Sequence, residues 1–412
     1  MIHFDRFTLN NGLRVLVHQD NSTPIVTMNL LYNVGARDED PNRTGFAHLF
    51  EHLMFGGSVN IPLYDEPLDR AGGENNAFTT NDITNYYLSL PKENIETGFW
   101  LESDRMLSLA FSQGNLGVQK SVVVEEFNQS YLNQPYGDAW LLLRPLAYKV
   151  HPYMWSTIGK EPQHIKDATL NDVKSFFFSH YAPNNAILCV SGNIEVDEVK
   201  RLAEKWFAPI PEREVKLRSL PKEPVQTEPR TLEVTRNVPY DSIYMAFHMC
   251  NRNHPDYPAT DLITDLLSNG KSSRLFQNLV KERKLFSDIN AFITGDVDDG
   301  LLVVTGRLVQ DISFEEAQNE IFGELNRLKN EKVSEYELSK VVNKFESTFT
   351  FGLTSPLEKA FNLCYYEMLG DAGWLNSIVG QYRNVTIDDI TRVAGSIFTP
   401  DNCSTLLYKA AR

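Results

Sequence analysis

The sequence predicts an α+β protein of two similar domains, each an antiparallel-rich sheet covered by helices. Strand-like and helix-like segments are mixed in the first half, which is typical of this class. A proline-rich stretch divides the 412 residues near their middle, and the second half repeats a pattern of the first. We therefore predict a zinc-binding catalytic domain over residues 1–208, a linker over 209–230 and a similar non-catalytic domain over 231–412.

The elements of the first half follow from the spacing of its apolar residues. Short apolar runs rich in β-branched and aromatic residues predict strands at 13–18, 25–32, 83–90 and 186–190. Helical spacing predicts helices at 46–55, 94–109, 117–132, 171–180 and 196–207. The order of the strands within the sheet does not follow from this pattern.

The linker and the repeat rest on separate observations. Five prolines stand among many charges between residues 209 and 230, which indicates an extended segment. A shift of 213 residues places the predicted helix at 46–55 on the segment 258–270, and both end in glycine. The polar residues of the first helix do not recur in the second, so the second domain is predicted to share the fold without the chemistry.

The most informative motif is His48-Leu49-Phe50-Glu51-His52, which reads H-x-x-E-H. Residues four apart lie on one face of a helix, so His48 and His52 can direct two imidazoles at one metal ion. Glu51 then stands beside the metal, where a base for a metal-activated water is needed. The alternative is a solvated polar face. The neighbouring residues are largely apolar, and polar groups on an apolar helix need a partner or a ligand.

A third protein ligand is expected, because a catalytic zinc ion usually has three. The best candidate lies in the helix predicted at 117–132, where three valines lead into Glu125 and Glu126. Adjacent helical residues point about 100° apart, so only one of the two can face the metal. Glu126 shares a face with Val122 and Val123 and is chosen, whereas Glu125 is expected to be solvated.

These motifs give the chain a family resemblance. It resembles the pitrilysin family of zinc peptidases, the inverzincins, and most of all their short two-domain branch related to the mitochondrial processing peptidase. The matching stretches run from Gly45 to Phe55, Asn76 to Tyr87, Val122 to Glu126 and Ser273 to Leu279. The resemblance thus spans nearly the whole chain.

The resemblance implies a zinc metalloendopeptidase that cleaves peptides or short unfolded polypeptides. It implies one Zn²⁺ per chain on His48, His52 and Glu126, with Glu51 as general base. It also implies that the segment 75–80 is an edge strand beside the zinc, to which substrate adds as a further strand. The substrate-binding residues would be Asn76, Ala77, Phe78 and Thr79. The other interpretation of this segment is an ordinary edge strand or loop.

Two positions depart from the family pattern. Many members carry a supporting Glu seven residues before the ligand Glu, where this chain has Gln119. Active members also place an Arg and a Tyr, seven residues apart, in an inactive domain where they grip the substrate. The matching positions here hold Val280 and Ser287. The chain therefore looks like the zinc-bearing half of a pair, completed by a related subunit in a heterodimer or by a homodimer.

Composition excludes some function classes and leaves others open. A net charge of −15 disfavours nucleic acid and mildly favours positively charged peptides. No apolar run approaches the length of a membrane span, and the first residues do not read as a signal peptide. Four scattered cysteines indicate buried thiols in a reducing compartment. We predict a cytoplasmic protein, or an exported one if a leader has been removed.

Two other functions fit the same fold. One is a non-catalytic scaffold, like the core subunits of respiratory complexes, and the presence of all the ligands and of Glu51 disfavours it. The other is a protein that stores or senses metal, which would not need Glu51 beside the ligands.

Overall fold

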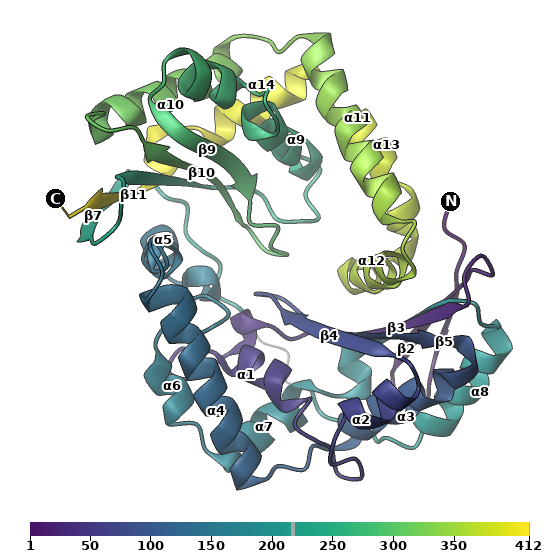
Figure 1. The fold of residues 1–412 in the computed structure, drawn as a ribbon. Helices are drawn as coiled ribbons and strands as arrows, with labels where there is room; N and C mark the ends of the chain where they lie inside the picture. Colours follow the sequence, from purple (N-terminus) through teal and green to yellow (C-terminus); the bar gives the residue numbers. More distant parts are fainter. Residues whose placement is uncertain (216–218, 412) are drawn as a thin grey trace. The chain divides into compact units, whose positions relative to one another are not determined.

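The computed structural model describes residues 1–215 and 219–411, so part of the predicted linker, residues 216–218, lies outside the described residues. The chain forms two compact units, each assembled from three segments. Unit 1 comprises Met1–Phe127, Trp155–Leu220 and Phe349–Ser377. Unit 2 comprises Asn128–Met154, Pro221–Thr348 and Ile378–Arg412. Figure 1 traces the elements of both units along the sequence.

Unit 1 contains a six-stranded sheet with the order β1-β2-β6-β3-β5-β4. Its strands are β1 (Asp5–Thr8), β2 (Arg14–Gln19), β3 (Ile25–Tyr32), β4 (Glu74–Thr79), β5 (Thr84–Pro91) and β6 (Ala186–Gly192). Only β2 and β6 run parallel; every other neighbouring pair is antiparallel. The β4 strand ends the sheet and, within residues 1–215 and 219–411, pairs with β5 alone, so one edge of β4 is open.

The two faces of this sheet carry different helices. On one face α3 (Ile95–Leu107) approaches β3 and β5 so closely that a Cβ added to Gly98 would meet the Met28 sulfur at 2.8 Å. On the other face α12 (Pro356–Leu369) covers β3 and β6, and its Cys364 thiol donates to the carbonyl oxygens of Asn29 and Ile187. Side chains alternate along a strand, so the buried Asn29–Asn85 carboxamide pair lies on the α12 face.

Unit 2 repeats this design in five strands, with the order β7-β11-β8-β10-β9. They are β7 (Arg230–Arg236), β8 (Ser242–His248), β9 (Phe286–Ile293), β10 (Leu301–Leu308) and β11 (Cys403–Ala410). Here β7 and β11 are the parallel pair, as β2 and β6 are in unit 1. The helix α9 (Tyr257–Ser268) follows β8 as α1 (Phe46–Leu53) follows β3. The structure confirms the prediction of two similar sheet-and-helix domains.

Each sheet is covered by one helix from the opposite half of the sequence. The helix α5 (Ala139–Ala147) packs on β11, β8 and β7 in unit 2, whereas α12 packs on the sheet of unit 1. Both ranges, 1–208 and 231–412, therefore contribute to both units. The domain boundary and linker predicted at 209–230 remain a prediction.

Described residues of the predicted linker are anchored by hydrogen bonds within their own units. The Arg213 guanidinium donates to backbone carbonyls of Tyr181, Met106 and Leu107 in unit 1. The Glu223 carboxylate accepts three consecutive backbone N–H groups, those of residues 149 to 151, in unit 2.

The remaining helices complete the two units. Unit 1 also has α2 (Asp65–Arg70), α4 (Gln113–Phe127), α6 (Pro162–Lys166), α7 (Leu170–His180) and α8 (Val196–Trp206). The other helices are α10 (Phe314–Asn330), α11 (Glu335–Gly352), α13 (Ile378–Arg383) and α14 (Ile387–Ile397). A π-helical turn, Asn128–Leu132, follows α4, so the helix predicted at 117–132 is regular only to residue 127. Within the described residues, no helix is both long and apolar enough to cross a membrane.

Candidate metal centre

The motif helix α1 (Phe46–Leu53) presents its polar residues on one side and its apolar residues to the core of unit 1. It begins after Gly45, whose φ of +88° is a left-handed conformation that favours glycine. Five of its residues are buried: Phe46, Ala47, Leu49, Phe50 and Leu53. His48, Glu51 and His52 are only partly buried. The Tyr86 hydroxyl on β5 donates to the Phe50 carbonyl and ties the helix to the sheet.

A buried carboxyl group holds the N-terminus of α1. The Glu39 side chain accepts the backbone N–H groups of Gly45 and Ala47 at 2.8 Å and the indole N–H of Trp155 at 3.1 Å. Such acceptors satisfy N–H groups that the first helical turn leaves unpaired. Burial raises the pKa of Glu39 to about 8. Glu39 lies six residues before Gly45, outside the positions from which sequence patterns predict helix caps, so its role was missed.

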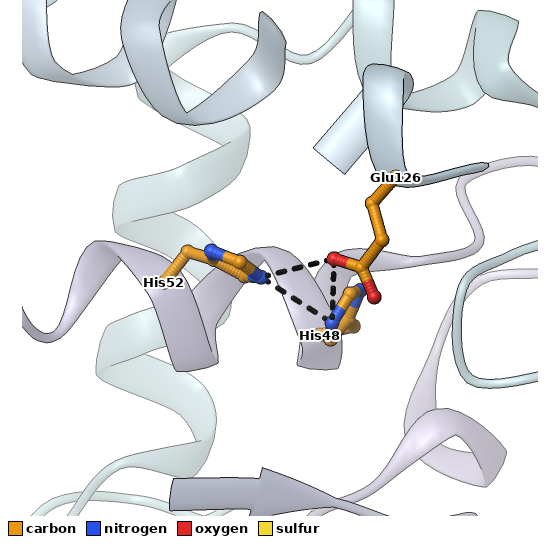
Figure 2. Close-up of side chains that lie close together, drawn as sticks. All are labelled: His48, His52 and Glu126. Carbon is orange, nitrogen blue, oxygen red and sulfur yellow. Dashed lines mark hydrogen bonds and ion pairs between the residues drawn. The ribbon is translucent and has the colours of Figure 1, made fainter. Parts of the chain in front are cut away.

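Three side chains converge beside α1, and Figure 2 shows them together. His48 Nε2 lies 3.4 Å from His52 Nε2, and Glu126 Oε2 lies 3.6 and 3.5 Å from these two nitrogens. Ligands about 2.0–2.1 Å from a tetrahedral zinc ion stand about 3.3 Å apart. Among the described residues this is the one group of three His, Cys, Asp or Glu ligand atoms within 4.8 Å of one another. The donor set and its spacing fit a zinc ion.

The electrostatics of the group suit metal binding. A hydrogen bond from His52 lowers the pKa of Glu126, so this carboxylate stays ionised. Burial lowers the pKa of His48, so its imidazole stays neutral, the form that binds metal. The His48 Nδ1 atom is buried and has no hydrogen-bond partner among the described residues. The supporting partner that a ligand His usually has is therefore not identified for His48.

Glu126 lies on α4 between two buried residues, Val123 three positions before it and Phe127 one position after it. Val123 and Phe127 are 1% and 3% exposed, whereas Glu125 is exposed. Val122, one turn before Glu126 on the same face of α4, is 43% exposed, much like the Glu126 side chain at 41%. Gln119 lies half-buried, seven residues earlier on α4.

Glu51 lies outside the ligand group and contacts the edge strand. The Thr79 hydroxyl of β4 donates to Glu51 Oε2 at 2.7 Å. The Ala77 N–H donates to the Asn76 side-chain oxygen at 2.8 Å. Because this N–H bonds a side chain of its own strand, we infer that it points to the open edge. Phe78 packs against Phe361 of α12, with ring centroids 5.4 Å apart. The predicted edge strand beside the metal motif is thus present, whereas the contact of Thr79 with Glu51 was not predicted.

Comparison with known proteins shows that most of this chain is similar to peptidases. The description "Insulinase (Peptidase family M16)" matches residues 14–139, and "Peptidase M16 inactive domain" matches residues 167–345. "Zinc protease PqqE" of Helicobacter pylori is 30% identical, over 98% of this chain and 92% of that protein. "Uncharacterized zinc protease YmxG" of Bacillus subtilis is 24% identical, over 98% of this chain and 97% of that one.

Solved structures agree with these sequence matches. A protease from Helicobacter pylori has a TM-score of 0.93 at 29% identity, covering 99% of this chain and all of that chain. The periplasmic protease PqqL from Escherichia coli has a TM-score of 0.81 at 18% identity. That alignment covers 99% of this chain but 48% of PqqL, whose chain is about twice as long.

Proposed function

Because the chain belongs to peptidase family M16, the insulinase- and pitrilysin-like zinc proteases, we propose that it is a zinc metalloendopeptidase acting on peptides or short unfolded polypeptides. The observation that carries this proposal is the triangle of ligand atoms on His48, His52 and Glu126, with Glu51 one residue before the second histidine. These three residues would hold one zinc ion per chain.

The chemistry divides between the metal and the protein. Zinc, when bound, would activate a water molecule and polarise the scissile carbonyl. The Glu51 carboxylate takes the proton of the attacking water and passes it to the leaving amine. The three ligand side chains supply only part of a tetrahedral shell and leave room for a reacting group.

The open edge of β4 is the proposed substrate site. Asn76, Ala77, Phe78 and Thr79 would bind an extended peptide through backbone pairing, which tolerates many side-chain sequences. The net charge of −15 favours positively charged peptides weakly. Gln119 would support the metal ligands without adding a charge.

A related partner subunit, or a second copy of this chain, would complete the substrate grip. Val280 and Ser287 offer neither a guanidinium nor a phenol, and the nearby Arg283 pairs with Glu320. The alignment with about half of PqqL supports this proposal, since that relative carries a further chain segment of similar length. The proposed compartment is the cytoplasm. Export is the alternative, because PqqL is named as periplasmic.

Zinc content and chelator-sensitive cleavage test the function. Purified protein is expected to hold about one zinc per chain and to lose peptide cleavage in the presence of a chelator, with recovery when zinc is added. His48→Ala, His52→Ala and Glu126→Ala should each lower zinc content sharply, because each removes one of three ligands. Elemental analysis of each variant gives the measurement.

Glu125→Ala is the matched control, since it removes the adjacent exposed carboxylate and should keep the zinc. Full zinc retention by Glu126→Ala together with loss in Glu125→Ala would show that the third ligand is misassigned. Zinc binding without any cleavage, alone or with a related subunit, would favour the non-catalytic scaffold.

A further inference from the structure

We propose that Thr79 is a positioning residue, whose hydroxyl holds the Glu51 carboxylate in the orientation needed for proton transfer. This inference rests on the proposed function, in which Glu51 is the base. It assigns to Thr79 a side-chain role that is separate from backbone pairing with a peptide.

The contact itself is short. Thr79 Oγ1 donates to Glu51 Oε2 at 2.7 Å, and an O–H donor facing an ionised carboxylate makes one of the stronger hydrogen bonds in proteins. Glu51 is half-buried, and a glutamate side chain on a helix has several staggered rotamers from which a hydrogen bond can select one. Threonine is β-branched and stiff about χ1, which makes it a good fixed point for such a side chain.

The backbone around Thr79 is itself fixed. Thr79 pairs with Thr84 of β5, and the Thr80 hydroxyl accepts the N–H groups of Asp82 and Ile83 in the turn that follows. The N–H groups of Ala36 and Arg37 donate to the carbonyl oxygens of Thr80 and Asn81. An ion pair at 2.8 Å between Arg37 and Asp82 adds a further link between this turn and the segment 36–37.

The segment that contacts this turn also holds the N-terminus of α1. Ala36 and Arg37 precede Glu39, which accepts the N–H groups at the start of α1. The strand that carries Thr79 and the helix that carries Glu51 are therefore fastened to the same short segment, and the hydroxyl–carboxylate distance is set from both sides.

This arrangement links the base to the bound peptide. The Ala77 N–H, which bonds the Asn76 side chain and which we infer to point to the open edge of β4, belongs to the same strand as Thr79, two residues further along and about 7 Å away. A peptide paired with Ala77 is thus held in a fixed register to the hydroxyl that orients Glu51. One strand would place both the scissile bond and the base.

The competing interpretation is that the hydroxyl only stabilises packing of β4 against α1. Kinetics on three variants of the full chain separate the two. Thr79→Val keeps the shape and removes the donor, Thr79→Ser keeps the donor, and Thr27→Val removes a hydroxyl from the same sheet at its contact with Ser89.

We expect Thr79→Val to lower kcat roughly ten- to hundredfold, as loss of a charge-assisted hydrogen bond would, with KM and zinc content unchanged. Thr79→Ser should recover most of kcat, and Thr27→Val should match the wild type. Wild-type kcat in Thr79→Val would overturn the inference, as would equal losses in the Val and Ser variants.

A second measurement needs no activity. In metal-free protein, Thr79→Val should lower the unfolding temperature by about 2 °C. It should have no effect in a Glu51→Ala background, where the acceptor is absent. Equal shifts in the two backgrounds would show that the hydroxyl does not act through Glu51. Absence of chelator-sensitive cleavage in the wild type, both alone and with a related subunit, would instead contradict the proposed function, and the positioning role with it.

Discussion

Glu51→Gln is expected to keep about one zinc per chain and to lose most peptide cleavage. The amide cannot accept the proton of an attacking water, and general-base catalysis typically contributes about 10²–10⁴-fold to the rate. The side chain is not one of the three ligand atoms, so zinc content should not change. The glutamine oxygen can still accept the Thr79 hydroxyl, so local geometry should be conserved.

The measurement is kcat/KM for cleavage of an internally quenched fluorescent peptide. Elemental analysis of the same preparation gives its zinc content. Glu125→Gln is the control, because it makes the same chemical change on an exposed carboxylate of α4. Cleavage at a near wild-type rate by zinc-loaded Glu51→Gln would show that another group is the base. Loss of zinc together with activity would instead assign Glu51 to the metal shell.

The second large effect concerns the substrate grip. The isolated chain is expected to cleave peptides poorly, and a related chain that carries the Arg and Tyr should raise cleavage strongly. Loss of a single charge-assisted hydrogen bond costs about 1.5–3 kcal/mol, which is roughly tenfold to a hundredfold in transition-state binding. Co-expression with such a chain, followed by purification of the complex and kinetics, tests this expectation.

The same idea can be tested within this chain. Val280→Arg combined with Ser287→Tyr restores the two groups that the family pattern places there and should raise kcat/KM. Val280→Leu with Ser287→Phe is the matched control, since it adds bulk without the guanidinium or the hydroxyl. High activity of the unmodified chain by itself would contradict the need for a grip supplied by another subunit.

Local spacing explains which parts of the site could be predicted. His48 and His52 are one helical turn apart, so their convergence follows from helix geometry alone. The choice of Glu126 over Glu125 was harder, because it depends on which face of α4 is buried. Val123, three residues before Glu126, is buried and Glu125 is exposed, and this difference distinguishes the two carboxylates only in the folded chain.

The contacts that frame the site could not be predicted in this way. Thr79 reaches Glu51 across 28 residues, and Glu39 acts on a helix that begins beyond a loop. Neither contact has a periodic signal, because side-chain hydrogen bonds between a strand, a loop and a helix leave no regular spacing in the sequence.

By itself the sequence determined most element types of the first half, the likeness of the two halves and the H-x-x-E-H pattern, since each depends on residues close together in the chain or on a constant shift. The strand of residues 25–32, for example, was predicted with its observed bounds. Only the tertiary structure decided the strand order and the exchange of α5 and α12 between units. Strand pairing and helix docking depend on which distant surfaces complement each other, and a one-dimensional pattern holds no record of that choice.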